Sequence, residues 1–256
     1  MNRFDGLAAT WDDDPAKVAG AERAAASLRD AIPLVGSGWA ALELGSGTGL
    51  LSRALAADLG AITLVDTSEQ MTIIGAERVS AATEEHVTAC CLDLTVETPP
   101  TAPYEIAYSM LALHHMADVA AVLMAVHEVL VPGGWVGILD LDHDPDGSFH
   151  RAGAGEHHPH EHRPQGHERL DHEHLGQHEH ADQHGTESVD HVHDGFSPAT
   201  LTTLLRSAGF VDVEVAMAGF AVEKGEPPRA YPVVRAVGRR APSDTMTDAV
   251  SPTDPG

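Results

Sequence analysis

Three glycines and two carboxylic acids are spaced in a way that suits a nucleoside ligand. Gly45, Gly47 and Gly49 follow a short apolar run and precede an apolar helical pattern, which predicts a strand, a tight turn and a helix. Without a Cβ, glycines let the turn approach a ligand closely, and the helix that follows offers unpaired N–H groups. A second apolar run ends at Asp66, where a parallel strand would place a carboxylate on a ribose. With Glu43 beside the turn, these residues predict a nucleoside pocket.

The spacing of the glycines in the turn distinguishes two kinds of nucleotide-binding site. Residues 43–49 read E-L-G-S-G-T-G, and this G-x-G-x-G differs from the G-x-G-x-x-G turn that holds a pyrophosphate. A carboxylate at Glu43 would repel a pyrophosphate but attract the ammonium group of an amino-acid tail. The stretch resembles the first motif of the class I S-adenosylmethionine-dependent methyltransferases. A dehydrogenase of the Rossmann type is disfavoured for the same reasons.

The elements that must position these residues alternate along the chain. Apolar runs predict strands at 41–44, 61–65, 86–92, 104–109, 135–141, 211–215 and 231–238, with helical patterns between most of them. The E-V-L-V-P-G-G-W stretch at 128–135 reads as a helix end and also resembles a motif of this methyltransferase class. The resemblance implies an α/β, Rossmann-like sheet of seven strands in the order 3-2-1-4-5-7-6, with the last strand antiparallel and helices on both faces.

The resemblance also implies which residues hold the cofactor, S-adenosyl-L-methionine. Met71 would lie against the adenine, although an ordinary core methionine is the alternative, and Asp93 would accept a hydrogen bond from the adenine amino group. Residues 4–12 match an F-D-x-x-A-x-x-W-D segment that folds over the cofactor as a lid in related enzymes; otherwise Phe4 and Trp11 simply hold the first helix to the sheet. The expected cofactor-binding residues are Trp11, Glu43, Gly45, Ser46, Gly47, Gly49, Asp66, Thr67, Met71, Asp93, Leu94 and Ser109.

Histidines are the candidates for acid–base chemistry. His114 and His115 follow the fourth predicted strand, at the sheet edge where ligands bind in open parallel sheets, so either suits cofactor contact or a general base. His150 and His193 fall in D-L-D…D-G-S-F-H and V-H-D-G-F stretches that resemble the substrate loop of a methyltransferase subgroup. His115, His150 and His193 are therefore the catalytic candidates, with helix capping or packing as the alternative for the His114–His115 pair.

A histidine-rich stretch between these two motifs sets the chain apart. It has almost no aliphatic periodicity and cannot bury enough apolar surface to fold alone. Its closely spaced imidazoles favour Zn²⁺ or Ni²⁺, but their spacing matches no closed zinc module, so a solvated loop with incidental metal affinity is the alternative. The candidate ligands are His158, His160, His162, His172, His174, His178 and His180.

The predicted domain organisation follows from these segments. We expect an N-terminal lid and helix at 1–35, a methyltransferase domain at 36–142 and 191–240, a histidine-rich insertion at 143–190 and a disordered tail at 241–256.

The composition of the chain limits which kinds of partner it can bind. A formal net charge of −24 argues against nucleic acid, whose phosphates need lysine and arginine, and no apolar run is long enough to span a membrane. The only cysteines are adjacent, and the first residues lack a signal-peptide pattern, so a cytoplasmic protein is expected. The sequence therefore predicts a methyltransferase of the quinone-biosynthesis or another small-molecule type. The alternative is a metal-buffering or metal-responsive protein on a methyltransferase scaffold.

Overall fold

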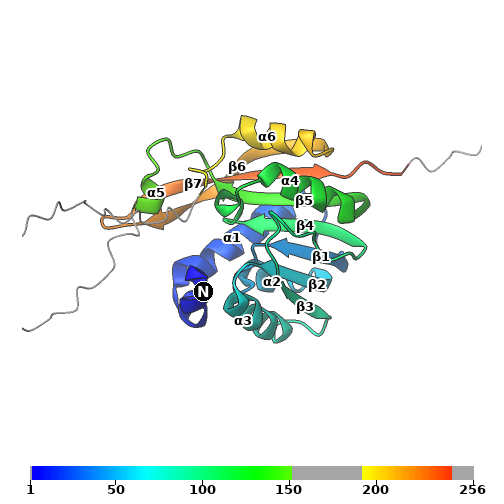
Figure 1. Cartoon of the computed structure of the whole chain (residues 1–256), viewed down its shortest axis with the longest axis horizontal. Helices are drawn as coiled ribbons and strands as arrows, with labels where there is room; N and C mark the ends of the chain where they lie inside the picture. The colour runs from blue at the N-terminus through cyan, green and yellow to red at the C-terminus, as the bar shows by residue number, and fades with distance from the viewer. Residues whose placement is uncertain (1, 152–191, 244–256) are drawn as a thin grey trace, which may run out of the picture.

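A computed structural model describes residues 2–151 and 192–243 of the chain (Figure 1). Its helical elements are the short η1 (Arg3–Gly6), η2 (Ala8–Asp13) and η3 (Leu113–His115), together with α1 (Pro15–Ala31), α2 (Leu50–Leu55), α3 (Glu69–Ser80), α4 (Val119–Val129), α5 (Ser148–Arg151) and α6 (Pro198–Ser207). Its strands are β1 (Trp39–Leu44), β2 (Leu59–Asp66), β3 (Val87–Cys91), β4 (Tyr104–Met110), β5 (Leu130–Leu141), β6 (Val211–Lys224) and β7 (Arg229–Arg239).

The strands form one sheet in the order β3-β2-β1-β4-β5-β7-β6. The first five strands are parallel, and β7 runs antiparallel to both of its neighbours, β5 and β6. The strand order predicted from the sequence is confirmed. Because the order reverses on either side of β1, the carboxyl ends of β1 and β4 flank the point where ligands enter open sheets of this kind.

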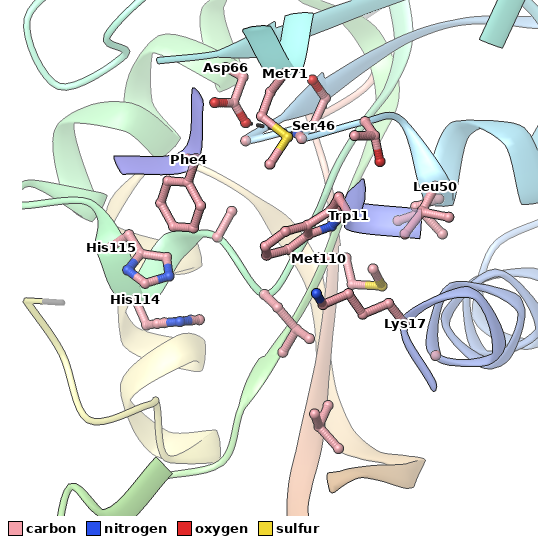
Figure 2. A pocket seen from close by; sticks show the side chains of 18 of the residues that line it. Phe4, Trp11, Lys17, Ser46, Leu50, Asp66, Met71, Met110, His114 and His115 are labelled. Carbon is pink, nitrogen blue, oxygen red and sulfur yellow. Dashed lines mark hydrogen bonds between the residues drawn. The ribbon is translucent and has the colours of Figure 1, made fainter. Parts of the chain in front are cut away.

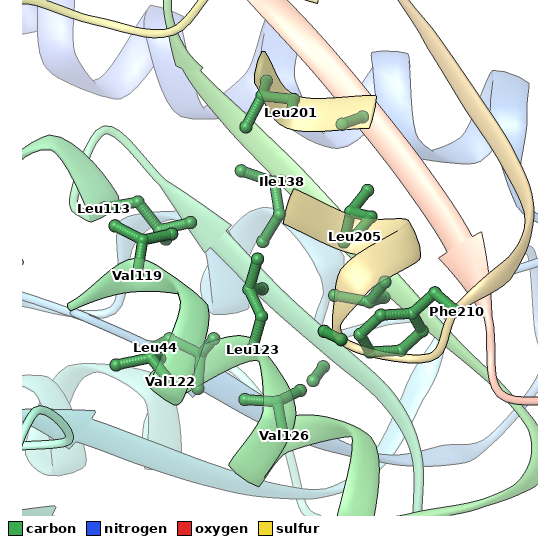
Figure 3. Close-up of a cluster of buried hydrophobic side chains, with 14 of the residues drawn as sticks. Leu44, Leu113, Val119, Val122, Leu123, Val126, Ile138, Leu201, Leu205 and Phe210 are labelled. Carbon is green, nitrogen blue, oxygen red and sulfur yellow. The ribbon is translucent and has the colours of Figure 1, made fainter. Parts of the chain in front are cut away.

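Helices cover both faces of the sheet, and each face has its own apolar cluster. On one face α1, α2 and α3 pack through buried side chains such as Leu28, Leu51 and Val79. On the other, α4 and α6 pack against β4 and β5, as Figure 3 shows for Leu123 and Leu205 around Ile138. These two clusters hold the sheet edge rigid where the loops after β1, β2 and β4 meet.

Two strands are longer than their patterns predict by five residues or more. The helix end expected within 128–135 falls at Val129, and β5 begins at once, because Leu130 pairs with Tyr104 and Gly133 donates its N–H to the carbonyl of Arg240. Strand β6 was expected to end at residue 215 but continues to Lys224, since a register shift around Gly219, whose φ is +81°, lets pairing with β7 resume. The hairpin of β6 and β7 therefore extends beyond the sheet (Figure 1).

The flanks of the predicted insertion lie side by side. The N–H of Asp144 donates to the carbonyl of Asp194 over 2.7 Å, and the N–H of Phe196 donates to the carbonyl of Leu141 over 2.8 Å. A Cβ at Gly195 would come within 2.5 Å of the Asp142 carbonyl, so only glycine fits this crossing. Residues 141–144 and 194–196 thus cross side by side.

Within the described ranges, no helix has both the length and the apolar character that a membrane crossing requires.

Candidate active site

A cavity of about 1200 Å³ lies at the carboxyl ends of β1, β2 and β4, beneath the N-terminal segment. Its walls come from five places: the glycine turn after β1, the ends of β2 and β3, the loop after β4, helix α1 with the residues before it, and the tip of the β6–β7 hairpin with α5. Figure 2 shows side chains from most of these elements pointing into one space. The volume is large enough for a nucleoside-sized ligand and a second small molecule together.

The glycine turn is built for close approach. Gly45 has a φ of +61°, and a Cβ there would come 2.3 Å from the Cβ of Ala112. Gly49 has a φ of +72° directly before α2, and a Cβ there would come 2.4 Å from Val79. At Gly47 an added Cβ would meet only the sulfur of Met71, at 4.0 Å. The turn therefore packs tightly below and leaves room on the cavity side for a ligand.

Asp66 ties the turn to the end of β2. Its carboxylate accepts from the N–H of Gly47 over 2.8 Å and from the N–H of Ser68 over 2.9 Å. Burial raises the pKa of Asp66, and the hydrogen bonds from Ser68 and Gly47 oppose that shift. The carboxylate lines the cavity near Met71 (Figure 2), at the position expected to meet a ribose.

Glu43 forms part of the cavity floor and is almost excluded from solvent. Its carboxyl oxygen accepts from the hydroxyl of Ser52, whose backbone N–H also reaches the carboxyl in the first turn of α2. The Ser52 hydroxyl lies 2.7 Å from the hydroxyl of Tyr108, a buried neighbour on β4. Burial raises the pKa of Glu43 to about 8, so the group is mostly neutral at pH 7 in the ligand-free chain.

The part of the cavity lining near the ends of β2 and β3 suits a flat apolar group. Met71, Leu92 and Leu94 line the cavity, and Met71 and Leu94 are otherwise buried. Asp93 lies beside them and accepts from both the N–H and the hydroxyl of Thr95, which fixes its orientation. Together they form an apolar part of the lining, a slot with the Asp93 carboxylate beside it.

The N-terminal segment is tied down over the cavity by Asp12. The Asp12 carboxylate accepts from the hydroxyl of Thr48 in the glycine turn and forms ion pairs of 2.6 Å with Arg53 on α2 and 2.7 Å with Arg78 on α3. Arg78 also donates to the carbonyl of Ala9 over 3.1 Å. Residues 3–13 are thus joined to the turn and to two helices by one carboxylate.

A second set of contacts anchors the start of the same segment. The hydroxyl of Ser68 donates to Asp5 over 2.7 Å, and the amide of Asn2 donates to the hydroxyl of Thr67 over 2.9 Å. Both partners directly follow Asp66, so the segment is fixed to the end of the cavity where Asp66 lies. Thr67 itself also lines the cavity.

Aromatic side chains of the N-terminal segment form the roof. The ring of Phe4 lies edge-on to Trp11 at 6.0 Å and to His115 at 5.7 Å. The amino group of Lys17 lies 3.7 Å from the centre of the Trp11 ring, and Figure 2 shows its side chain reaching from α1 into the cavity near Met110. The guanidinium carbon of Arg3, another lining residue, lies 5.3 Å from the centre of the Phe4 ring, so the roof offers both apolar rings and cations.

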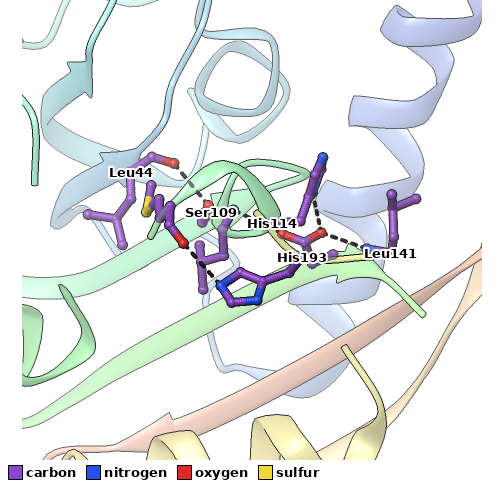
Figure 4. A network of polar contacts seen from close by, with 8 residues as sticks. Leu44, Ser109, His114, Leu141 and His193 are labelled. Atoms are coloured by element: carbon purple, nitrogen blue, oxygen red, sulfur yellow. Dashed lines mark hydrogen bonds and ion pairs between the residues drawn. The ribbon is translucent and has the colours of Figure 1, made fainter. Parts of the chain in front are cut away.

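A buried histidine–aspartate pair lies at the far end of the cavity. Nδ1 of His114 and Oδ1 of Asp140 are 2.6 Å apart, and both side chains are almost fully buried (Figure 4). Asp140 also accepts from the backbone N–H groups of Leu113 and Leu141. A carboxylate held this way only accepts, so Nδ1 of His114 donates and Nε2 is the accepting nitrogen of the neutral ring.

The backbone before this pair is strained. Leu111 has a φ of +52°, unusual for a residue with a branched side chain, and its N–H donates to the carbonyl of Leu139. The strained residue also lines the cavity. Such strain is concentrated at functional sites, and here it turns the chain from β4 toward His114.

Most expected cofactor residues meet at this cavity. Ser109 is an exception because its hydroxyl donates to the carbonyl of Leu44 beneath the turn, outside the cavity lining (Figure 4). Gly49 serves the packing of α2 rather than the lining. The residues of the expected set that do line the cavity are Trp11, Glu43, Gly45, Ser46, Gly47, Asp66, Thr67, Met71, Asp93 and Leu94.

The three catalytic candidates differ in where they lie relative to the cavity. His115 lines the cavity beside Phe4. His193 does not: its Nε2 lies 3.1 Å from the carbonyl oxygen of Met116 and its ring packs on Phe196, which is a structural arrangement. The backbone of His150 is in α5, and its side chain lies outside the described part of the chain.

The metal prediction falls on residues that the structure does not describe. His158, His160, His162, His172, His174, His178 and His180 all lie outside the described ranges. In residues 2–151 and 192–243, no three His, Cys, Asp or Glu side chains are grouped to hold a metal ion. Metal binding by the histidine-rich stretch stays a prediction.

Three features of the site have little or no sequence signal. Asp12 stands within the matched N-terminal motif, but its partners Arg53 and Arg78 are far along the chain. His114 was a candidate in the sequence, but nothing there pairs it with Asp140, which lies 26 residues further along the chain near the end of β5. The hairpin tip lines the cavity only because β6 continues past its predicted end.

Comparisons with known proteins agree with this geometry. Residues 42–136 match the sequence profile of a methyltransferase domain family. The ubiquinone biosynthesis O-methyltransferase of Bordetella pertussis is 28% identical over 160 residues, which are 57% of this chain and 61% of the relative. The chain thus spans 61% of the length of the curated relatives it matches.

Solved structures share the fold. A putative methyltransferase from Bacillus halodurans superposes with a TM-score of 0.58 at 13% identity, over 85% of this chain and 98% of the other. Human N-acetylserotonin methyltransferase, solved in complex with S-adenosylmethionine, superposes with a TM-score of 0.52 at 18% identity, over 85% of this chain and 51% of the other. The described residues therefore adopt the seven-stranded methyltransferase fold, and the part from 42 to 136 matches a methyltransferase domain.

Proposed function

We propose that this chain is an S-adenosylmethionine-dependent methyltransferase that transfers a methyl group to a hydroxyl oxygen of a small molecule. One observation carries the proposal: a single cavity joins the glycine turn, Asp66 and the apolar slot at one end to the buried His114–Asp140 pair at the other. The matched methyltransferase domain and the O-methyltransferase named among the relatives support the same reaction.

The residues present fit the cofactor. The slot of Met71 and Leu94 takes the adenine, with Asp93 at its rim. Asp66 faces the ribose, and the open side of Gly47 leaves room beside it. This assignment uses no anion-binding group near the turn, in keeping with a ligand that has no phosphate.

The amino-acid tail of the cofactor carries both charges, and the cavity has a partner for each. Glu43 in the floor meets the ammonium group, which favours ionisation of its carboxyl. Lys17, held over Trp11, meets the carboxylate. These two assignments place the tail between the floor and the roof of the cavity.

When bound, S-adenosylmethionine supplies a methyl group on a sulfonium; the acceptor oxygen takes the methyl as the carbon–sulfur bond breaks and leaves its electron pair on sulfur. His114 takes the hydroxyl proton at Nε2. Asp140 holds the ring in the required tautomer and stabilises the charge that the ring gains. The N-terminal segment excludes water and aligns the reactants, which is the larger contribution to such displacements.

Product formation tests the proposal. Purified full-length chain is incubated with S-adenosylmethionine and a panel of phenols and hydroxy acids, and S-adenosylhomocysteine is quantified by mass spectrometry. Acceptor-dependent formation of that product, lost in His114→Asn, is the expected result. Absence of product with every acceptor, in a chain that does not bind the cofactor, would overturn the proposal.

A further inference from the structure

We infer that the methyl acceptor is an anionic aromatic molecule, a hydroxylated aryl carboxylate, whose ring lies between Phe149 and Phe220 and whose carboxylate meets Arg23 and Lys224. The inference rests on the proposed function and adds the substrate class. All four residues line the cavity, and they come from α1, α5 and the extended part of β6.

This wall of the cavity is rich in cations although the chain as a whole is strongly acidic. The chain has 15 lysines and arginines against 39 aspartates and glutamates, and its formal net charge is −24. An anion approaching such a molecule is repelled everywhere except where cations are gathered. Arg23 and Lys224 supply two positive charges at the acceptor end of the cavity, in addition to Arg3 and Lys17 in the roof.

Aromatic rings hold these cations in place. The guanidinium carbon of Arg23 lies 5.5 Å from the centre of the Phe220 ring, and the amino group of Lys224 lies 4.3 Å from the centre of the Phe149 ring. Cation–π contacts of this kind keep the full charge of the cation and fix its position. The wall therefore presents ring faces and positive charge together, which suits a flat anion.

The same wall is fixed relative to the proposed base. Phe149 lies edge-on to His114 with ring centres 6.3 Å apart, and edge-on to Tyr231 at 5.0 Å. Ser148, its neighbour, accepts a hydrogen bond from Arg229 on β7 over 2.6 Å. An aryl ring packed on Phe149 thus has one edge toward His114 and the other toward the hairpin cations.

Two carboxylates, Asp14 and Glu223, also border this part of the cavity. Asp14 accepts from the N–H of Ala16 as the N-cap of α1 and lies 3.9 Å from Lys17. Glu223 precedes Lys224 on a strand, where successive side chains point to opposite faces. Phe220, Val222 and Lys224 share the other face of that strand.

The cofactor's own carboxylate does not account for Arg23 and Lys224. Lys17, in the roof over Trp11, is the cation proposed above for that carboxylate. Arg23 is six residues further along α1, a rise of roughly 9 Å, and Lys224 belongs to the hairpin tip. Their charges belong to the acceptor end of the cavity.

A matched pair of probes tests the inference. The binding of 4-hydroxybenzoate and of 4-hydroxybenzamide, which share the ring and hydroxyl and differ in charge, is measured by calorimetry on the full chain saturated with S-adenosylhomocysteine. We expect the acid to bind about tenfold more tightly than the amide, the difference that a charge-assisted hydrogen bond makes. The double variant Arg23→Gln, Lys224→Gln should lose this preference, and Arg206→Gln, the same change on an exposed face of α6, should keep it.

The outcomes separate this inference from the proposed function. Failure of S-adenosylhomocysteine to bind counts against the proposed function, and the two probes are then compared on the chain alone. Equal affinity for the acid and the amide, or no binding of the acid at millimolar concentration, overturns the inference even where the cofactor product binds. Retention of the full preference in the double variant overturns the assignment of its two cations.

Discussion

His114 and Asp140 meet through a hydrogen bond of 2.6 Å beneath the acceptor end of the cavity. Asp140 lies near the end of β5 and His114 in the turn after β4, so two neighbouring strands bring them together. The carboxylate of Asp140 also accepts hydrogen bonds from two backbone N–H groups. Toward the His114 ring it can therefore only act as an acceptor. The accepting nitrogen of His114 is therefore set by the fold before any ligand arrives.

Replacing His114 tests that role. His114→Asn should lower kcat by about 100-fold or more, the usual contribution of a positioned base, while affinity for S-adenosylhomocysteine stays unchanged. The control is His86→Asn, at an exposed residue directly before β3. Steady-state kinetics and calorimetry measure the two quantities, and a kcat within threefold of the native value would exclude His114 as the base.

Glu43 should make the affinity for S-adenosylhomocysteine depend on pH. Because burial raises the pKa of Glu43 to about 8 and an ammonium group favours the carboxylate, binding near pH 7 should release up to one proton. Affinity for S-adenosylhomocysteine should then rise between pH 6 and about 7.5. Calorimetry in buffers of different ionisation enthalpy counts the protons, and Glu43→Gln should release none. Equal proton release in both proteins would contradict the assignment.

The same group should lower stability as pH rises. The folded pKa of Glu43 lies above the ordinary value of 4.5, so the unfolded chain loses this proton first. The contribution of Glu43 to the free energy of unfolding is complete below about pH 4.5 and falls as pH rises toward 8. Glu43→Gln should therefore raise Tm more at pH 8 than at pH 5. A larger gain in Tm at pH 5 would mean that the folded pKa of Glu43 is not raised.

Asp12 should control how long the ligand stays bound. Asp12→Asn removes the charge that joins residues 3–13 to Arg53 and Arg78, so the roof opens more often. We expect S-adenosylhomocysteine to dissociate about tenfold faster, as the loss of charge-assisted contacts implies. Trp11 fluorescence in a stopped-flow instrument measures the rate. Asp13→Asn, its exposed neighbour, is the control, and equal rates in the two variants would mean that the roof does not gate the site.

Lys17 distinguishes the two carboxylates that the cavity is proposed to hold. Lys17→Gln should weaken S-adenosylhomocysteine binding by about tenfold and leave the binding of adenosine, which has no carboxylate, unchanged. Calorimetry with both ligands makes the comparison. An equal loss for both would show that Lys17 acts through the packing of Trp11 rather than through charge.

Local patterns were sufficient for the strand order and for the glycine turn that lines the cavity. The turn at Gly45 and Gly47 and the strand ending at Asp66 are contiguous in sequence, and their geometry follows from residue type. The starts of α3 and α6 also follow from local sequence, because the side chains of Ser68 and Ser197 cap these helices. These features depend on neighbours a few residues apart.

The acceptor end could not be predicted in the same way. The strand pattern of β6 breaks at Gly219, and only pairing with β7 shows that it resumes and brings Phe220 into the cavity. His193 was expected at the site because its motif matched, yet its ring nitrogen faces the Met116 carbonyl. Asp12 finds its arginine partners only through the packing of α2 and α3. Each depends on contacts between distant segments.

The most direct measurement is calorimetric titration of the full chain with S-adenosylhomocysteine, with Asp66→Asn in parallel and thermal unfolding as a check, because Asp66 also holds the N–H of Gly47. We predict one site per chain with micromolar affinity, unaffected by a chelator, and weaker by at least about tenfold in the folded variant. No binding at millimolar ligand, with or without Zn²⁺, would contradict the methyltransferase assignment.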